Sequence, residues 1–341
     1  MTRKDLRTLT CPFCRKKLYL GHSYFEKKGR LIHATLLCDC DAYPIVGGVL
    51  FLTKNGIKEK ACLFLQQNSL PKSEAIPIFL FRLPLGNFLT VKIIFLVSRL
   101  NIFKNLSFKN FMKFFISIGI YEKKWGTYLL SRFKSKSFCP AVVTSSLIRK
   151  NSKVLDLASG TGHFLYILKR KVKEKQITAV EKSLPGIYLA KKYFCPGANF
   201  IYADLEYPLP FKDGIFDSIF VNDALQYISN KSRLGSEIVR ILKRNGFVSL
   251  SGLYNSKFKR GFIDPVHFPE TPSGYASYFP GLKYSVFSEK NSTEGDLKHV
   301  DRRRAERKLE ELKTFTILLS EKEMKKDIKA DMKSLIPESF D

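Results

Sequence analysis

The 341-residue sequence has few acidic residues, a single tryptophan and no long uninterrupted apolar run. Its most apolar region, residues 75–100, is broken by prolines and cations, and its uncharged stretches fall well short of the roughly 20 residues of a membrane-spanning helix. No apolar segment follows the charged N-terminus, so a secretory signal is not expected. We therefore expect a cytoplasmic protein with no transmembrane segment.

The scarcity of acidic residues leaves a strongly basic chain. Asp and Glu number 31 against 58 Lys and Arg, a formal net charge of +27. Residues 1–150 hold 26 basic and 7 acidic residues (+19), whereas residues 151–341 hold 32 and 24 (+8). A basic N-terminal half favours polyanions, either RNA or the anionic headgroups of a membrane contacted peripherally. An ordinary solvated surface of a lysine-rich chain is the alternative.

Four of the seven cysteines form two close pairs in residues 1–55. Cys11 and Cys14 make a C-x-x-C turn, and Cys38 and Cys40 follow after two segments that predict short strands. Four thiolates suit a tetrahedral structural Zn²⁺, and a unit this small has too small a hydrophobic core to fold stably without such an ion. We therefore expect a zinc-binding module, unless one of the two pairs is accidental.

Residues 56–150 contain no recognisable chemical motif. The segment from Ile102 to Tyr121 combines lysines with many phenylalanines and isoleucines, and it predicts a basic, aromatic helix. Such a helix either lies on a membrane surface or caps the sheet as a lid over a substrate pocket. We favour the cap or lid, and we expect the only tryptophan, Trp125, to serve in packing.

From residue 151 to 255, segments typical of strands alternate with segments typical of helices, as in a doubly wound parallel α/β sheet. The expected strands are 153–157, 177–180, 200–203, 217–221 and 247–253, with Gly246 as a break before the last. Acidic residues stand within or just after four of them, namely Asp156, Glu181, Asp204 and Asp223. Because parallel strand ends share one edge, these carboxylates should line one crevice.

The segment VLDLASGTGHF, Val154 to Phe164, organises this region. A strand, two glycines and a helix start let the backbone approach a ligand closely. The dinucleotide fingerprint G-x-G-x-x-G does not fit, since Ala158 and His163 stand at its first and third glycines, and no G-K-[ST] follows. Glu181 ends the second strand, where a carboxylate can accept from ribose hydroxyls. A nucleoside ligand without phosphates is therefore expected.

On these motifs, residues 151–255 resemble a class I methyltransferase that uses S-adenosylmethionine. VLDLASGTGHF is similar to that family's V-L-D-x-G-x-G-x-G turn: Asp156, Gly160 and Gly162 match, and Ala158 replaces the first glycine. The resemblance implies a Rossmann-like, seven-stranded sheet over residues 151–320. It also implies that the turn, Ala158 included, surrounds the methionine part of the cofactor.

The same resemblance assigns the remaining cofactor-binding residues. Glu181 would hold the ribose, Asp204 would lie near the adenine amino group and Leu205 would pack on the ring, with Asn222 completing the set. Methyl transfer needs mainly an aligned nucleophile, so no catalytic residue is obligatory. If a base is used, the candidates beyond the fourth and fifth strands are Asp223, Tyr227 and His267.

The N-terminal cysteines and the sequence DAYPIVGGVLFL, residues 41–52, resemble the zinc-ribbon module related to the small activating subunit of tRNA methyltransferases. Tyr43, Pro44, Ile45 and Gly48 match that family's pattern, whereas Gly47 and Leu50 depart from it. The resemblance implies a zinc ribbon in front of the methyltransferase domain.

Three functions follow from these features. The first is methyl transfer to a small-molecule or lipid-like acceptor, because the N/D-P-P-[YF] motif of enzymes that methylate amino groups of nucleic acids is missing after the fourth strand. The second is methylation of RNA, favoured by the basic N-terminal half and the zinc ribbon. The third is a non-catalytic scaffold with a cofactor fold. Residues 321–341 are expected to form a charged, solvated tail.

Overall fold

The computed structural model describes residues 1–66, 76–100, 102–257, 268–303 and 312–337. Within these ranges the strands form a single mixed sheet of thirteen, whose middle is the predicted seven-stranded unit in the order β7-β6-β5-β8-β9-β12-β10. Neighbours from β7 to β9 are parallel, and β12 is antiparallel to both β9 and β10. The bounds are β5 (Val154–Leu157), β6 (Ile177–Glu181), β7 (Asn199–Tyr202), β8 (Phe216–Asn222), β9 (Leu242–Tyr254), β10 (Lys283–Ser288) and β12 (Thr314–Ser320).

Helices cover both faces of this sheet, so every residue of β5, β6 and β7 is buried. They include α7 (His163–Leu168), α8 (Leu184–Leu189) and α9 (Lys231–Ile241), and α8 continues as one π-helical turn, Ala190–Phe194. The predicted α/β fold is therefore confirmed. One boundary was wrong: Gly246 lies inside β9, where Asn245 at φ 60° marks an irregularity instead of a strand start.

The cysteine-bearing unit extends the same sheet instead of standing apart. Its strands are β1 (Tyr19–Lys27), β2 (Arg30–Leu37), β3 (Ala42–Val46) and β4 (Val49–Phe51). β4 pairs in parallel with β7, so that Val49 lies beside Phe200 and Phe51 beside Tyr202. Away from the sheet, Arg15 forms an ion pair with Glu237 of α9 at 2.6 Å. The first 52 residues and the central sheet thus share one core.

The described parts of residues 56–150 are mainly helical, and most of these helices bury an apolar face against the rest of the protein. The main helices are α2 (Gly56–Leu65), α3 (Asn87–Leu100), α4 (Phe108–Ser117), α5 (Lys123–Leu130) and α6 (Cys139–Thr144). α4 turns Phe111 and Phe115 inward, and the ring of Phe111 lies 5.3 Å from that of Tyr188 on α8. Because its apolar side packs on the sheet's helices, α4 acts as a cap and cannot offer that side to a membrane.

The C-terminal part adds two further strands beyond β10, namely β11 (Asp296–Val300) and β13 (Ile328–Lys329), and a short helix, α12 (Met332–Leu335). Ile328 and Leu335 are buried, and Arg170 donates hydrogen bonds to the carbonyls of Ser334 and Leu335. The charged stretch expected to be solvated is thus largely exposed between residues 321 and 337, but these two buried side chains hold it against the rest of the protein. The charged sequence from Asp301 to Lys313 also predicts a helix, most of which lies outside the described residues. No helix of the described ranges is both long and apolar enough to cross a membrane.

Candidate functional site

The glycine turn joins β5 to α7 and takes its shape from three left-handed backbone positions. Ala158, Gly160 and Gly162 have φ values of 57°, 55° and 92°. A Cβ on Gly160 would meet nothing within 4 Å, so this position borders open space. A Cβ on Gly162 would lie 2.5 Å from Cβ of Ala190, so this glycine lets α7 pack against the turn that follows α8. The two glycines thus serve different purposes.

A third glycine, Gly186 on α8, completes the turn's surroundings and was missed by the sequence analysis. Its Cβ would lie 2.8 Å from the carbonyl oxygen of Gly160. Only a residue without a side chain lets α8 approach the turn so closely. The sequence offers no motif for it beyond its place in the helix that the pattern from Leu184 to Tyr193 predicts.

Asp156 lies at the end of β5 beneath the turn and is 1% exposed. Its Oδ2 atom is buried and has no hydrogen-bond partner. Burial, reinforced by the nearby carboxylate of Glu181, raises the pKa of Asp156 well above its usual range. An unpartnered buried carboxylate of this kind gains stability from a cationic or hydrogen-bonding ligand.

Glu181 ends β6 and faces the same turn. Its Oε2 accepts from the backbone N–H of Gly160 at 2.7 Å, and its Oε1 accepts from the N–H groups of Lys182 and Ser183 at 2.8 Å each. Burial raises the pKa of Glu181, although these three backbone donors oppose the shift. The carboxylate is therefore held rigidly at the edge of the turn.

A cavity of about 740 Å³ opens over these groups, within the usual range of small-molecule sites. The predicted residues Asp156, Ala158, Gly160, Glu181 and Asn222 line it, as do Asp223 and Tyr227. Asp204 and Leu205 are not among its lining residues. Asp204 accepts from the N–H of Glu206 at 3.0 Å and lies 3.8 Å from Nζ of Lys182, and Leu205 is buried in the core.

Another part of the cavity wall comes from the helical cap, which carried no motif in the sequence. It is built by Tyr121, Trp125, Tyr128, Leu129, Arg132 and Phe138. Trp125 stacks on Tyr128, with ring centroids 5.1 Å apart, but it is also 53% exposed at the cavity, so it does more than the packing expected from the sequence. The cavity therefore has an aromatic part from the cap and a carboxylate-bearing part from the turn and the strand ends.

Arg132 is the cation of this wall. Burial lowers the pKa of its guanidinium, while Asp223 opposes that shift from 3.5 Å. Asp223 itself has φ 53° and also accepts from Nε2 of Gln226 at 3.1 Å. Asn222 accepts from the hydroxyl of Ser251 at 2.7 Å. Tyr227 is partly exposed at the cavity, and His267 lies outside the described residues.

His163, the first residue of α7, also borders the cavity but is enclosed by aromatic rings. Its ring centroid lies 4.6 Å from that of Phe194 and 4.8 Å from that of Phe133, and Nδ1 is 3.0 Å from Oγ1 of Thr161. Burial, with a smaller contribution from Arg132, lowers the pKa of His163 to about 3. The imidazole is therefore neutral and supports the turn structurally.

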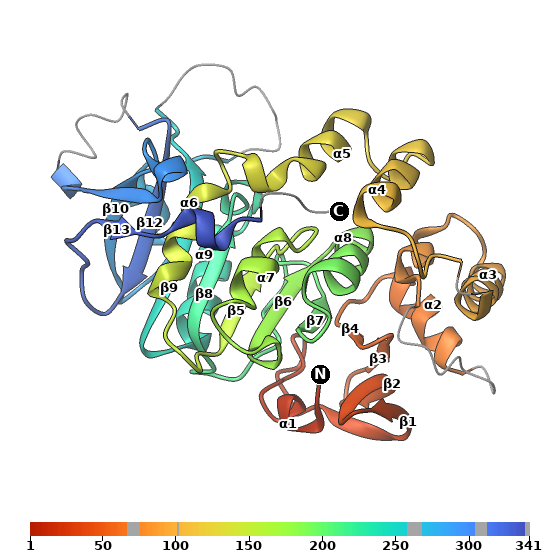
Figure 1. Ribbon diagram of the computed structural model, residues 1–341. Coiled ribbons are helices and arrows are strands. Elements are labelled where there is room, and N and C mark those ends of the chain that lie inside the picture. Colours follow the sequence, from red (N-terminus) through yellow and green to blue (C-terminus); the bar gives the residue numbers. More distant parts are fainter. Residues whose placement is uncertain (67–75, 101, 258–267, 304–311, 338–341) are drawn as a thin grey trace.

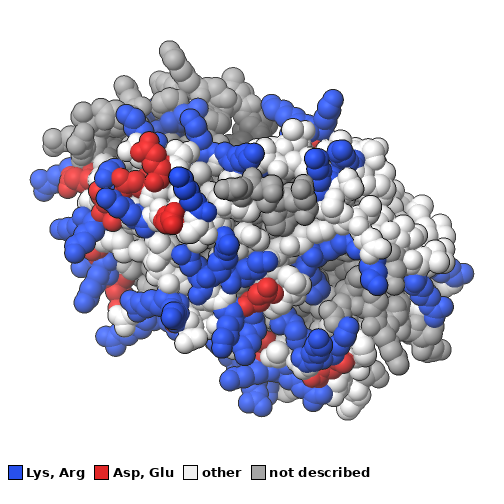
Figure 2. All heavy atoms as spheres, viewed as in Figure 1, with Lys and Arg blue, Asp and Glu red and all other residues white. Residues whose placement is uncertain are grey.

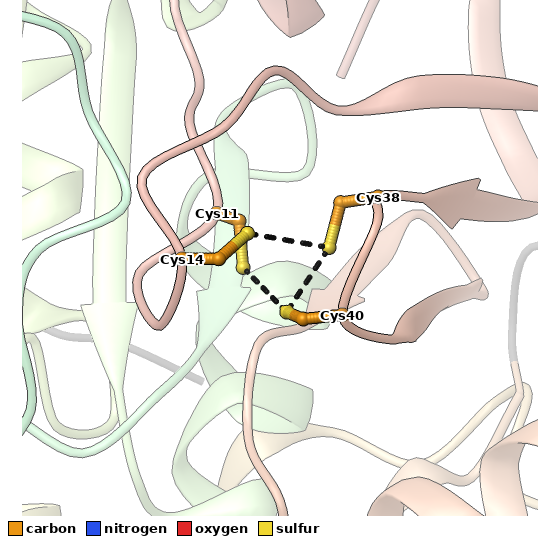
Figure 3. A group of neighbouring side chains, drawn as sticks. All are labelled: Cys11, Cys14, Cys38 and Cys40. Atoms are coloured by element: carbon orange, nitrogen blue, oxygen red, sulfur yellow. Dashed lines mark hydrogen bonds between the residues drawn. The ribbon is translucent and has the colours of Figure 1, made fainter.

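The four predicted metal ligands come together away from this cavity. The Sγ atoms of Cys11, Cys14, Cys38 and Cys40 all lie within 4.8 Å of one another (Figure 3). The separations of 3.6 Å (Cys11–Cys40), 3.3 Å (Cys38–Cys40) and 3.9 Å (Cys14–Cys38) resemble the roughly 3.8 Å between thiolates that share a tetrahedral Zn²⁺ at about 2.3 Å. This donor set could hold such an ion.

Comparison with known proteins adds to this geometry. Residues 155–250 match the family model described as a methyltransferase domain. A demethylmenaquinone methyltransferase from Thermotoga maritima is 38% identical over 108 residues, or 32% of this chain and 46% of that protein. A ubiquinone/menaquinone biosynthesis C-methyltransferase from Pectobacterium atrosepticum is 31% identical over 110 residues, or 30% and 43%. The chain thus spans less than half the length of these curated relatives.

Two solved structures are also similar. An S-adenosylmethionine-dependent methyltransferase from Thermotoga maritima has a TM-score of 0.42 and 20% identity, covering 61% of this chain and 98% of that one. A complex of the Trm112 methyltransferase activator with a methyltransferase from Haloferax volcanii gives 0.43 and 18%, covering 57% and 94%. The family match, the strand order and the glycine turn agree, and the chain therefore carries a class I S-adenosylmethionine-dependent methyltransferase domain.

Proposed function

We propose that this protein binds S-adenosylmethionine at the glycine turn and transfers its methyl group to a small, lipid-like acceptor that contains an aromatic ring. The residues around the turn fit the cofactor. Asp156 offers a buried oxygen without a partner, Gly160 borders open space, and Glu181 is fixed at the edge of the same cavity. Asp156 and the turn would hold the methionine part, and Glu181 the ribose. When bound, the cofactor supplies a methyl group on a positively charged sulfur.

The observation that carries the acceptor class is the aromatic wall of the same cavity. Tyr121, Trp125 and Tyr128 offer flat apolar surface for a ring, and Arg132 places a cation among them. The curated relatives support this class, since two of them are named for the methylation of quinones or their biosynthesis. A reduced quinone has both an aromatic ring and hydroxyl oxygens that Arg132 could bind.

In this proposal the chain contributes alignment and proton transfer. Holding acceptor and methyl donor in line can lower the barrier by roughly 7–11 kcal/mol. The cofactor would supply the methyl group and keep the electron pair of the broken carbon–sulfur bond, and Asp223 would take up the proton that the acceptor loses. Arg132 and Gln226 contact the carboxylate of Asp223 and would position it as the base. Tyr227 is the other candidate on the described cavity wall.

We further propose that Cys11, Cys14, Cys38 and Cys40 bind a structural Zn²⁺ and form a zinc ribbon. The cluster joins the start of the chain to the turn before β3, and β4 then pairs with β7 of the methyltransferase sheet. A metal here would stabilise the edge of that sheet and take no part in methyl transfer.

RNA is the second candidate acceptor, and its support is the distribution of charge. Many Lys and Arg side chains stand on the face seen in Figure 2, with few acidic groups between them. Binding through several phosphates should weaken steeply as salt is added. An affinity for RNA that does not change with salt would count against this candidate.

The deciding experiment combines cofactor binding with methyl transfer. Calorimetry measures binding of S-adenosylmethionine to the wild type, and Glu181→Ala is the control that should bind poorly. Absence of binding to the wild type would overturn the proposal and favour the non-catalytic scaffold. Transfer of labelled methyl is then measured with reduced demethylmenaquinone and with total RNA as acceptors. Label in the quinol, abolished by Asp223→Asn and by Arg132→Gln, is the expected result, whereas label in RNA alone would replace the acceptor.

A further inference from the structure

α3 is unusual among the helices of the cap, because much of its apolar surface is uncovered. Phe88 is 65% exposed, Leu96 57% and Leu100 59%. At about 100° per residue, these side chains together with Leu89, Lys92 and Arg99 fall within an arc of roughly 120° on one side of the helix. Val91, Ile94 and Ser98 occupy the opposite side and are buried. We call the exposed arc the α3 face.

This face is apolar and cationic at once. Lys92 and Arg99 stand among its leucines, and the Nζ of Lys92 lies 4.3 Å from the ring centroid of Phe88. Beyond the helix, Ile102 is exposed and Lys104 follows. Scattered exposed apolar residues are ordinary on soluble proteins, whereas several on one helical face together mark an interaction surface.

The surrounding segment is almost free of acidic residues. Residues 76–136 contain 11 Lys and Arg but only one acidic residue, Glu122. Exposed lysines continue from α3 onto α4 and α5 with Lys109, Lys113, Lys123 and Lys124. In Figure 1, α3 lies at the edge of the molecule, beyond α2, where a flat partner can reach it. The positive charge of this segment favours a partner with an extended, negatively charged surface.

We propose that the α3 face binds the surface of a bilayer containing anionic lipids. Phe88, Leu89, Leu96 and Leu100 enter the boundary between headgroups and acyl chains, while Lys92 and Arg99 contact the headgroups. Burial of apolar side chains and attraction to anionic lipids are the two forces that hold an amphipathic helix in this position. The assignment rests on the face itself and is independent of the methyl acceptor.

Other occupants fit the face less well. A second copy of the chain would bring like charges together at Lys92 and Arg99. A nucleic acid would satisfy those cations but would leave Leu96 and Leu100 in water. α4, whose sequence also suggested an amphipathic helix, has already buried its apolar side in the core.

The test is sedimentation of the full chain with vesicles of phosphatidylcholine, alone or mixed with phosphatidylglycerol. We expect stronger binding to the mixed vesicles. The double variant Phe88→Gln and Leu96→Gln should weaken vesicle binding by about tenfold or more. The double variant Lys92→Gln and Arg99→Gln should weaken it by a similar factor, and the remaining binding should no longer depend on salt. The matched control is Tyr19→Ser with Leu37→Ser, which removes two exposed apolar side chains from β1 and β2 and should leave binding unchanged.

Affinity for S-adenosylmethionine and thermal stability, measured on the same variants, separate a lost surface from a lost fold. The proposal is overturned if the wild type binds neither vesicle, or if the Tyr19/Leu37 variant loses as much binding as the Phe88/Leu96 variant. It is also overturned if the Phe88/Leu96 substitutions instead abolish self-association, or if RNA competes fully with the vesicles.

Discussion

Glu181 accepts a hydrogen bond from the backbone N–H of Gly160 at 2.7 Å, which ties the end of β6 to the turn that follows β5. The sequence suggested both residues as separate contacts of one ligand. The structure shows that each also positions the other, because the carboxylate fixes the turn and the turn partly satisfies the buried carboxylate. Ligand binding and local stability are therefore coupled at this pair.

Replacing Glu181 by alanine should affect both properties. Three backbone N–H groups lose their acceptor, which should lower the free energy of unfolding by about 1–3 kcal/mol. Affinity for S-adenosylmethionine should fall by roughly tenfold or more as the ribose contacts are lost. Chemical unfolding and calorimetry measure the two effects. Glu206→Ala is the matched control: Glu206 accepts from the N–H groups of Ser229 and Asn230 outside the cavity, so only stability should drop.

The two glycines of the turn should respond differently to alanine. In Gly160→Ala the new Cβ meets no protein atom, so stability should fall only by about 1 kcal/mol from the left-handed backbone, but affinity for S-adenosylmethionine should fall at least tenfold. In Gly162→Ala the Cβ collides with Ala190, and stability should fall by more than about 2 kcal/mol. Melting curves with and without the cofactor distinguish the two. Equal losses of stability would contradict this division.

Asp156→Asn should stabilise the protein in the absence of S-adenosylmethionine and lower its affinity for this cofactor. Because burial raises the pKa of Asp156 in the folded state, folding stability is lost as pH rises above the carboxyl's unfolded value, and an uncharged amide avoids that loss. The melting temperature of the variant at neutral pH should exceed that of the wild type without S-adenosylmethionine and rise less when it is added. Asp217→Asn is the control with the opposite sign, since Asp217 pairs with Lys243 at 2.9 Å.

The sequence was sufficient for the central sheet because its signals are local. Each strand of the α/β part is a short apolar run that ends in a polar residue, and the shared edge of parallel strands brings Asp156, Glu181 and Asn222 to one cavity. The same reasoning failed for Asp204, which does not line that cavity. The cysteine cluster could also be predicted from the sequence, because two close pairs of cysteines in two turns restrict where the four sulfur atoms lie.

What the sequence could not supply was pairing between distant segments. Nothing in Val49–Phe51 indicates that β4 joins β7, about 150 residues away, since parallel pairing leaves no local pattern. The aromatic wall was missed for the same reason: Trp125 and Arg132 lie in a segment without a motif, and only the fold brings them to the same cavity as the turn. The two buried side chains of the C-terminal stretch, Ile328 and Leu335, could not be recognised among its many charged residues.

Zinc should be found in the purified protein at about one ion per chain, lost in Cys14→Ser and Cys40→Ser. A structural metal contributes several kcal/mol to the free energy of folding, and each kcal/mol corresponds to roughly 2 °C or more in the melting temperature. Removal of the metal by a chelator should therefore lower the melting temperature by at least about 5 °C. Elemental analysis and calorimetry measure these quantities. Cys62 lies on α2 outside the cluster, so Cys62→Ser should retain both metal and stability. A metal-free wild type of unchanged stability would rule out the structural ion.

His163 should make the protein sensitive to mild acid. Its pKa is about 3 in the folded state and 6.5 for the ordinary side chain. Between these two pH values the unfolded chain therefore binds a proton at His163 that the folded chain does not bind. Stability should therefore fall as pH drops below about 6.5, by up to about 1.4 kcal/mol per pH unit, which integrates to about 2 kcal/mol between pH 7.5 and pH 5.

The measurement is the free energy of unfolding in urea across that range, for the wild type and for His163→Phe. A phenylalanine suits the ring cage formed by Phe133 and Phe194 and cannot titrate, so this variant should lose about 2 kcal/mol less than the wild type on acidification. His22→Phe, at an exposed position of β1, should keep the wild-type slope. Parallel slopes for the wild type and His163→Phe would mean that the acid sensitivity arises elsewhere, since only the cage around His163 excludes its proton while the protein is folded.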